Sequence, residues 1–220
     1  MKKRHRILRR VVGALLILVA ALLLAAWSLL RASLPQLDGT RTTGVRAKTT
    51  IARDALGVVT IQAQDRNDAM YALGFVHAQE RFFEMDLMRR MAAGELAELV
   101  GGAAVDMDKQ HRPFRMRERA LAALAKATPG QHATLDAYAG GVNAGLAALA
   151  SRPWEYWLLG EKPAPWTLTD SVLVLDAMFF DLNDSTNARE LAFDKIKSAL
   201  GENVYRFLSV SGGPWDARLL

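Results

Sequence analysis

The pattern of hydrophobic and polar positions divides this chain into an uninterrupted apolar run, two short extended segments and a series of stretches with helical periodicity. The apolar run covers residues 11–30, twenty positions without a charged side chain. A helix of that length rises about 30 Å, which matches the hydrocarbon core of a bilayer. The pattern therefore predicts a membrane or signal helix followed by a mostly helical domain.

Six basic side chains precede this run: Lys2, Lys3, Arg4, Arg6, Arg9 and Arg10. Without these six charges the net charge of +5 becomes −1, so the basic excess lies at one end and gives no support to nucleic-acid binding. Basic residues before a span keep the N-terminus in the cytoplasm, which places the rest of the chain in the periplasm or otherwise outside the cytoplasm. The absence of cysteine excludes disulfides, thiolate metal sites and a cysteine nucleophile within this chain.

Residues 1–33 are therefore expected to be a signal anchor or a signal peptide. The apolar run is longer than the core of a cleavable signal, which usually holds about 7–15 residues, and this favours an anchor in the cytoplasmic membrane. The small residues Ala32 and Ser33 leave a cleaved signal peptide as the alternative.

Residues 34–44 read as a linker interrupted by proline and glycine, and the domain is expected to begin at residue 45. Two segments that follow, residues 49–53 and 58–63, are rich in β-branched side chains and predict strands. Gly57 between them suits a turn with positive φ. The sequence thus predicts an antiparallel hairpin, which needs a packed helix or further strands to be stable.

The next stretch, residues 65–101, predicts the helix that stabilises this hairpin. Either Asp65 or Asn67 suits its N-cap, and Gly94 separates it from a second short helix. Its apolar positions recur at steps of three, four and seven, as in Ala69, Leu73, Val76, Phe83 and Leu87.

Two groups of polar residues suggest chemistry but have simpler interpretations. His77 has no serine or second histidine at ligand spacing, which favours a packed or surface residue over a catalytic one. Asp106, Asp108 and His111 could suggest a metal. The glycine and the final glutamate of a calcium loop are missing, however, so a helix cap or a salt bridge is expected.

Further helices are predicted for residues 112–127, 131–150, 167–182 and 190–200. Gly140 and Gly141 lower helix propensity by about 1 kcal/mol each relative to alanine, which predicts a close helix contact as compensation. Thr167 and Asp170 match a capping box at the start of the third helix. That helix is almost wholly apolar, and we expect it to be buried.

Residues 152–166 and 183–187 are expected to be loops. The first contains prolines and four aromatic residues, which form either a wall for an apolar ligand or part of the core: Trp154, Tyr156, Trp157 and Trp166. The second, Asn183-Asp184-Ser185-Thr186-Asn187, interrupts the helices with polar residues, and such a break often marks a functional site.

Residues 45–205 also carry a set of motifs known from one protein family. The motifs are Arg53-Asp54-x-x-Gly57-Val58-x-x-Ile61-x-Ala63, residues 71–86 (YALGFVHAQERFFEMD), Arg89-Arg90, residues 94–98 (GELAE), residues 137–143 (AYAGGVN), Glu155 with Leu158-Leu159-Gly160, and Pro165-Trp166 with Asp170. Together they resemble the penicillin acylase (penicillin amidase) family. The match over residues 74–90 is long and specific.

The resemblance implies that residues 45–220 are the α-chain region of an N-terminal-nucleophile hydrolase. The implied fold is α+β, the α-chain portion of an αββα fold, mostly helical here with an N-terminal β-hairpin. Members are precursors that cut themselves into α and β chains; the first serine of the β chain is the nucleophile, and its own α-amine is the base. They hydrolyse the amide bond of N-acylated small molecules, such as β-lactams and acyl-homoserine lactones, through an acyl-enzyme.

On this resemblance we expect no catalytic residue in this chain, which should be inactive without the β chain of the same precursor. Met178 matches a methionine of the family's acyl pocket, and Leu182 replaces an aromatic residue one turn later, which would favour aliphatic acyl groups. Two ordinary core residues are the alternative interpretation.

The resemblance also implies a structural calcium ion that binds one α-chain glutamate. The aligned position is Ala188, and Glu190, two residues later, is the candidate ligand. The competing function is a non-catalytic, membrane-anchored binding or scaffold protein that retains the α-chain fold.

Overall fold

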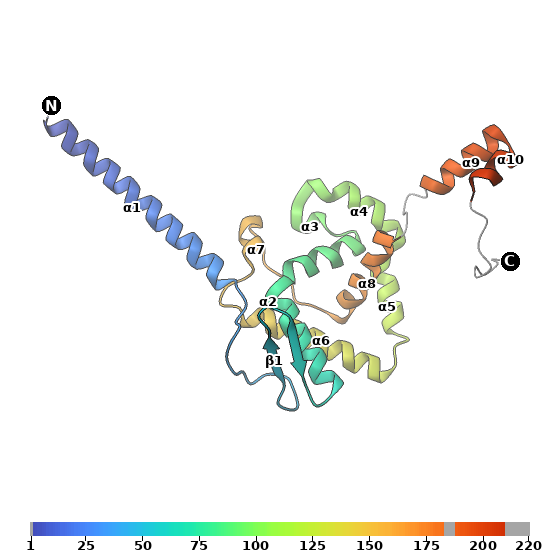
Figure 1. Ribbon diagram of the computed structural model, residues 1–220, viewed down its shortest axis with the longest axis horizontal. Helices are drawn as coiled ribbons and strands as arrows, with labels where there is room; N and C mark the ends of the chain where they lie inside the picture. The colour runs from blue at the N-terminus through green and yellow to red at the C-terminus, as the bar shows by residue number, and fades with distance from the viewer. Residues whose placement is uncertain (1, 183–187, 210–220) are drawn as a thin grey trace. The chain divides into compact units, whose positions relative to one another are not determined.

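The computed structural model describes residues 2–182 and 188–209, and the chain divides into two compact units, residues 1–177 and 178–220. The α-helices are α1 (Lys2–Ala32), α2 (Arg66–Ala93), α3 (Ala97–Val100), α4 (Val105–His111), α5 (Met116–Leu124), α6 (Pro129–Ala148), α7 (Trp154–Leu159), α8 (Leu168–Leu182), α9 (Ala188–Leu200) and α10 (Glu202–Leu208). Two 3-10 helices, η1 (Gly101–Ala104) and η2 (Arg112–Phe114), and two strands, β1 (Thr50–Arg53) and β2 (Val59–Gln62), complete the described elements (Figure 1). The expected fold, mostly helical with one N-terminal hairpin, is confirmed.

The apolar N-terminal run forms α1, as expected. Within it, residues Arg9–Ala32 are long and apolar enough to cross a membrane, and none of the most apolar part of this segment is buried. Exposed leucine, isoleucine and valine side chains on all sides of a helix are unfavourable in water, so α1 needs an apolar environment outside this chain.

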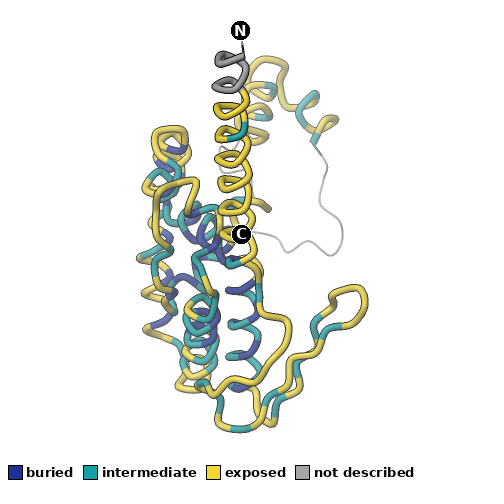
Figure 2. The backbone as a smooth tube through the Cα atoms, turned by 90° about the vertical axis from the view of Figure 1, so that its left-hand side faces the viewer, coloured by how far each residue is buried: buried dark blue, intermediate teal, exposed yellow. Residues whose placement is uncertain are grey.

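The predicted hairpin is also confirmed. β1 and β2 pair antiparallel, with Thr50 opposite Gln62 and Arg53 opposite Val59. The turn is closed by the backbone of Asp54 and by Gly57, whose φ of 81° is easily reached only by glycine. Figure 2 shows the hairpin as exposed or half-buried, so its own side chains bury little apolar surface.

The long helix α2 has the caps that the sequence predicts. The Asp65 side chain accepts a hydrogen bond from the Asp68 amide at 2.9 Å, and Gly94 ends the helix with a φ of 70°. The predicted apolar face is only partly right, because Ala69, Leu73 and Phe83 are half-buried while other positions are more deeply covered. The backbone leaves helical geometry at Arg81 (φ −147°), and this kink changes which side chains face the core.

The close helix contact predicted from the glycine pair is confirmed, and it joins α2 to α6. A β-carbon on Gly141 would lie 1.9 Å from the carbonyl oxygen of Tyr71, and one on Gly145 would lie 2.3 Å from that of Phe75. On the other helix, a β-carbon on Gly74 would lie 2.2 Å from the Tyr138 oxygen. The two backbones therefore touch at positions where no larger residue fits.

Side chains from α2, α3, α6, α7 and the segment just before α8 meet in the core, which comprises Ala78, Phe82, Met85, Leu99, Ala139, Val142, Tyr156 and Trp166. Of the aromatic residues with two open interpretations, Tyr156 and Trp166 belong to this core, whereas Trp154 and Trp157 are exposed.

The expectation of a loop over residues 152–166 is wrong in part, because α7 lies within it. Pro153 precedes its first residue and Gly160 ends it in the left-handed conformation, with φ 73°. Proline and glycine here bound a short helix, which is stabilised by the burial of Tyr156 and not by its length.

Two other helix boundaries differ from the prediction. The helix expected over residues 112–127 is α5 alone, because Arg115 adopts a left-handed φ of 52° that separates η2 from α5. The next helix, α6, begins at Pro129, earlier than expected, because Thr128 and Gln131 form a capping box around it.

In the second unit, α9 begins slightly before its predicted start, and α10 follows without having been predicted. The two helices pack through an edge-to-face contact between Phe193 and Tyr205 and an ion pair of 3.1 Å between Lys197 and Glu202. The polar segment 183–187, singled out as a possible site, lies outside the described residues.

Candidate functional site

A buried network of charged side chains fixes the start of α8, the helix that carries the candidate substrate-binding residues. Arg89 of α2 is 4% exposed. Its guanidinium donates to Asp86 at 2.8 Å and to Asp170 of α8 at 2.7 Å, and it also donates to the backbone oxygens of Ala164 and Pro165. One side chain thus joins α2 to the whole segment that leads into α8.

The carboxylate of Asp86 is fully buried and has three partners. Besides Arg89, it accepts a hydrogen bond from Arg90 at 2.8 Å and from the Tyr156 hydroxyl at 2.5 Å. Burial and this hydrogen bond to Asp86 raise the pKa of Tyr156, so its phenol stays protonated and continues to donate. The buried charge of Asp86 is therefore compensated from α2 and from α7.

Asp170 completes the network and also caps α8. Its carboxylate accepts from both the amide and the hydroxyl of Thr167, each at 2.7 Å. The capping pattern predicted from Thr167 and Asp170 is thus present in its acidic half, with aspartate in the role usually taken by glutamate. Arg117 of α5 lies 3.7 Å from the same carboxylate.

α8 is exposed along one side, which contradicts the expectation that it is buried throughout. Leu173 and Ala177 are buried, but Met178 is 51% exposed and Leu182 is 73% exposed. Leu175 and Phe179 are exposed as well, and the four apolar residues follow the i, i+3, i+4, i+7 spacing of one helix face. We call Leu175, Met178, Phe179 and Leu182 the α8 stripe.

The structure therefore brings Met178 and Leu182 together on one face of α8, one turn apart, but encloses neither. Leu175 and Phe179 were missed in the sequence, although their spacing relative to Met178 was available. Uniform apolarity cannot distinguish a face that this chain buries from a face that another chain buries, and this is why the burial of α8 was mispredicted.

Asp176 lies on α8 next to this stripe. Its Oδ2 atom is buried and has no hydrogen-bond partner among the residues that the structure describes. Burial raises the pKa of this carboxyl, and the nearby charge of Arg119 opposes the shift.

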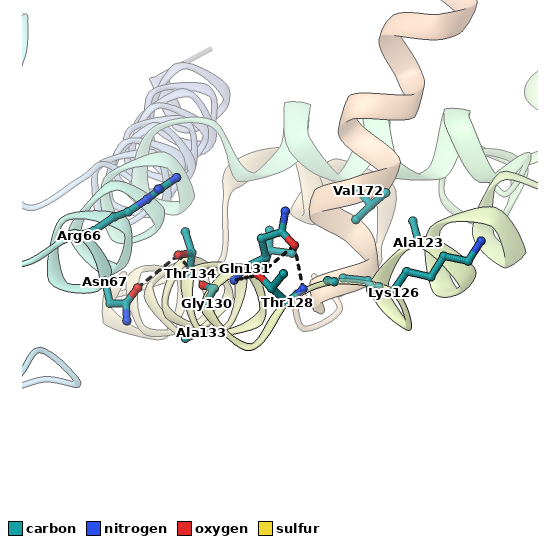
Figure 3. Close-up of a pocket in the computed structure, with 13 residues that line it drawn as sticks. Arg66, Asn67, Ala123, Lys126, Thr128, Gly130, Gln131, Ala133, Thr134 and Val172 are labelled. Atoms are coloured by element: carbon teal, nitrogen blue, oxygen red, sulfur yellow. Dashed lines mark hydrogen bonds between the residues drawn. The ribbon is translucent and has the colours of Figure 1, made fainter.

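A cavity of about 840 Å³ lies at the corner between α5 and α6, bordered by Val172 of α8 (Figure 3). Its lining residues include no carboxylate, histidine or serine. Two pairs of the polar side chains shown in Figure 3 bond to each other: Thr134 donates to Asn67, and Thr128 and Gln131 form the cap of α6. Met178 and Leu182 do not line this cavity.

The residues with simpler interpretations have structural roles. His77 is half-buried, its Nδ1 lies 2.9 Å from the Tyr138 hydroxyl, and burial lowers its pKa. Asp108 caps α3 by accepting from the amides of Leu96 and Ala97, each at 2.8 Å, which confirms the expected helix cap.

Glu190 lies exposed in the first turn of α9, where its carboxylate is accessible to a cation. Calcium takes six to eight oxygen ligands. In the part of the chain that the structure describes, no group of three or more histidine or acidic side chains surrounds a common point. The described residues therefore do not assemble a calcium site around Glu190, and we assign no step of a reaction to a metal.

Comparison with known proteins finds a matching family and similar relatives for most of this chain. Residues 48–212 match the family model described as penicillin amidase. The penicillin acylase 2 proenzyme of Pseudomonas sp. (strain SE83) is 42% identical over 153 residues, which cover 66% of this chain and 19% of the relative. The acyl-homoserine lactone acylase QuiP of Pseudomonas aeruginosa is 35% identical over 152 residues, which cover 68% of this chain and 18% of the relative.

The fold also matches a solved structure, that of a thermostable penicillin G acylase from Alcaligenes faecalis. The TM-score is 0.62 at 23% identity, and the match covers 78% of this chain and 97% of that chain. The present chain spans about a fifth of the length of the curated relatives it matches.

Proposed function

The chain belongs to the penicillin amidase family, and we propose that it is the α-chain part of an acylase that hydrolyses the amide bond of N-acylated small molecules. The relatives carry names that specify penicillin and acyl-homoserine lactones, which are both N-acylated amines. We propose the same substrate class here, with the serine nucleophile and its α-amine base on a β chain of the same precursor.

The relative coverage of the matches supports a separate catalytic chain. This chain covers nearly all of a chain in the solved acylase, 97%, but only 19% of a proenzyme of the same family. Among the described residues, His77 is engaged by Tyr138, and the lining of the cavity at α5 and α6 includes no carboxylate, histidine or serine. Without its partner, this chain should not hydrolyse amides.

The α8 stripe is the observation that carries the proposed contribution of this chain. Four large apolar side chains exposed on one helix face are unfavourable in water, so the stripe requires a ligand or a partner chain. We propose that Met178 and Leu182 form one wall of the acyl pocket and that the β chain covers the remainder of the stripe. The Arg89 network would then act as a positioning device, because it fixes the end of α8 that lies nearest to the core.

An acyl chain would contact the stripe through dispersion and the hydrophobic effect, without a specific polar contact. Such a pocket discriminates by shape, and one methylene group typically changes the preference by about 1–3 kcal/mol. Leucine at position 182, rather than an aromatic residue, leaves room for a flexible aliphatic chain. We therefore propose linear aliphatic acyl groups as preferred over phenylacetyl groups.

The test is hydrolysis by this chain produced together with its β chain, measured as release of the amine from aliphatic and phenylacetyl amides. Leu182→Phe is expected to raise kcat/KM for the phenylacetyl amide relative to the aliphatic one by about tenfold, a difference of roughly 1.4 kcal/mol. Leu200→Phe, at another exposed leucine of the second unit, is the matched control and should leave the ratio unchanged.

Two results would contradict these proposals separately. If Leu182→Phe leaves the ratio of kcat/KM for the two amides unchanged, Leu182 is not part of the acyl pocket, and the proposed acylase activity is unaffected by that result. Binding of N-acyl amides without hydrolysis by the two-chain protein would instead favour the alternative of a non-catalytic, membrane-anchored binding or scaffold protein.

We also propose that α1 anchors the chain in the cytoplasmic membrane with the domain on the periplasmic side. The support is the length and apolarity of residues Arg9–Ala32 and the six basic residues within positions 2–10. Glu190 remains our proposed calcium ligand, with a structural role only.

A further inference from the structure

α7 is a six-residue helix with an apolar tip that the core does not use. Tyr156 is its buried anchor, whereas Trp154, Trp157, Leu158 and Leu159 are exposed, Leu158 to 77%. Two tryptophans and two leucines on one short, solvent-facing helix are too apolar for a simple surface loop. The question is which apolar environment they contact.

The position of α7 next to the end of α1 indicates this environment. The Ser151 amide, three residues before α7, donates a hydrogen bond of 3.0 Å to the carbonyl oxygen of Ala32. Ala32 is the last residue of α1 and of the segment that is long and apolar enough to cross a membrane. Figure 1 shows α7 beside this end of α1. The tip of α7 is therefore next to the point at which α1 would leave the bilayer.

The side chains at this point have the chemistry of a membrane interface. The indole N–H of Trp157 donates to the Ser151 hydroxyl at 3.0 Å, and the Arg152 guanidinium lies 3.9 Å from the centre of its ring. The same pairing occurs at the end of α1, where the Arg31 guanidinium lies 5.8 Å from the ring of Trp27. Tryptophan is enriched at the headgroup level of bilayers, and arginine is attracted to anionic lipid headgroups.

We propose that α7 inserts Trp154, Trp157 and Leu158 into the outer headgroup layer of the membrane, beside the exit of α1. This inference rests on the proposed anchor and adds a second, interfacial contact to it. A single flexible linker would let the domain rotate freely above the membrane. Two adjacent contacts would hold it in one orientation, with α7 facing the lipid.

The test uses the full chain with its β chain in vesicles of phosphatidylethanolamine and phosphatidylglycerol. This chain has no cysteine, so once any cysteine of the β chain is replaced by serine, a single introduced cysteine can be labelled with an environment-sensitive fluorophore. Leu158→Cys probes α7, Leu22→Cys probes the middle of α1, and Leu121→Cys on α5 is a matched control at another exposed leucine. Quenching is measured with brominated lipid and, separately, with aqueous iodide.

We expect brominated lipid to quench the fluorophores at positions 22 and 158, and iodide to quench the one at position 121. If the label at position 158 is quenched by iodide, or by neither quencher while position 22 responds to lipid, the inference is wrong and water or a protein partner covers α7. If position 22 does not respond to lipid, the anchor itself fails, and the interfacial role of α7 fails with it.

Discussion

Replacing Arg89 by methionine removes the group that joins α2 to the start of α8. Methionine keeps much of the buried stem but none of the donors. The carboxylates of Asp86 and Asp170 are 0% and 4% exposed as side chains, so water cannot replace the lost partner without opening the core. The substitution should therefore destabilise the whole first unit.

The size of the loss in unfolding free energy depends on the hydrogen-bond partners that each carboxylate retains. Removing one partner of a buried ion pair costs about 3–5 kcal/mol. Asp86 retains Arg90 and Tyr156, and Asp170 retains Thr167. Because both charges remain partly compensated, we expect the lower end of this range, about 3 kcal/mol.

Urea unfolding of the detergent-solubilised chain, followed by tryptophan fluorescence, measures this loss. Trp166 is a suitable probe, since the Arg89 guanidinium lies 5.0 Å from the centre of its ring. With m of about 1–3 kcal/mol/M, the midpoint should fall by about 1 M or more.

The matched control is Lys109→Met. Lys109 and Asp106 form an i, i+3 pair like Asp86 and Arg89, but both are largely exposed. The control should change the free energy of unfolding by less than about 0.5 kcal/mol. A loss in Arg89→Met no larger than in the control would refute the view that burial makes this network essential.

Three further predictions concern packing, pH and calcium. Gly141→Ala should destabilise the first unit by about 1–3 kcal/mol, because the new β-carbon would lie 1.9 Å from the Tyr71 oxygen. In contrast, the new β-carbon of Gly140→Ala would lie 3.4 Å from its nearest atom, so this substitution should be neutral or stabilising. Equal changes in the free energy of unfolding for the two substitutions, measured by urea unfolding, would contradict the helix contact. Asp176→Asn should raise the urea midpoint at pH 7 but not below pH 3.8. Burial raises the pKa of the Asp176 carboxyl in the folded chain, so the folded chain loses stability as the pH rises and this carboxyl loses its proton. A gain of the same size at both pH values would show that charge is not the cause. Finally, Glu190→Gln should reduce the rise in melting temperature that calcium gives the two-chain protein, and a rise equal to that of wild type would exclude Glu190 as a ligand.

The parts of the fold that the sequence predicted well depend on local signals. Asp65 and Gly94 define the ends of α2, Gly57 permits the hairpin turn, and Gly141 of α6 indicates the contact with α2. Asp65, Gly94 and Gly57 act through their own backbone or through neighbours a few positions away, whereas the glycine pair reports its distant partner only by its cost in helix propensity. The family motifs added the identity of the domain, which the comparisons confirm.

The parts that the sequence did not predict depend on distant partners. α7 is stable because Tyr156 bonds to Asp86, 70 positions earlier, and no local pattern reports that contact. The exposed stripe of α8 was read as core because only the structure shows which apolar face the chain itself covers. Met178, Leu182 and Glu190 remain predictions as site residues.

The separation of these partners along the chain also bears on how the protein is made. α2 leaves the ribosome, and on our proposal crosses the membrane, well before its partners do. Arg89 must wait for Asp170, which follows it by 81 positions, and until then Asp86 and Arg89 belong to a helix without its core. The interval before Asp170 arrives is thus the period in which the nascent chain is most open to proteases and to aggregation, and only synthesis past this residue allows the domain to close.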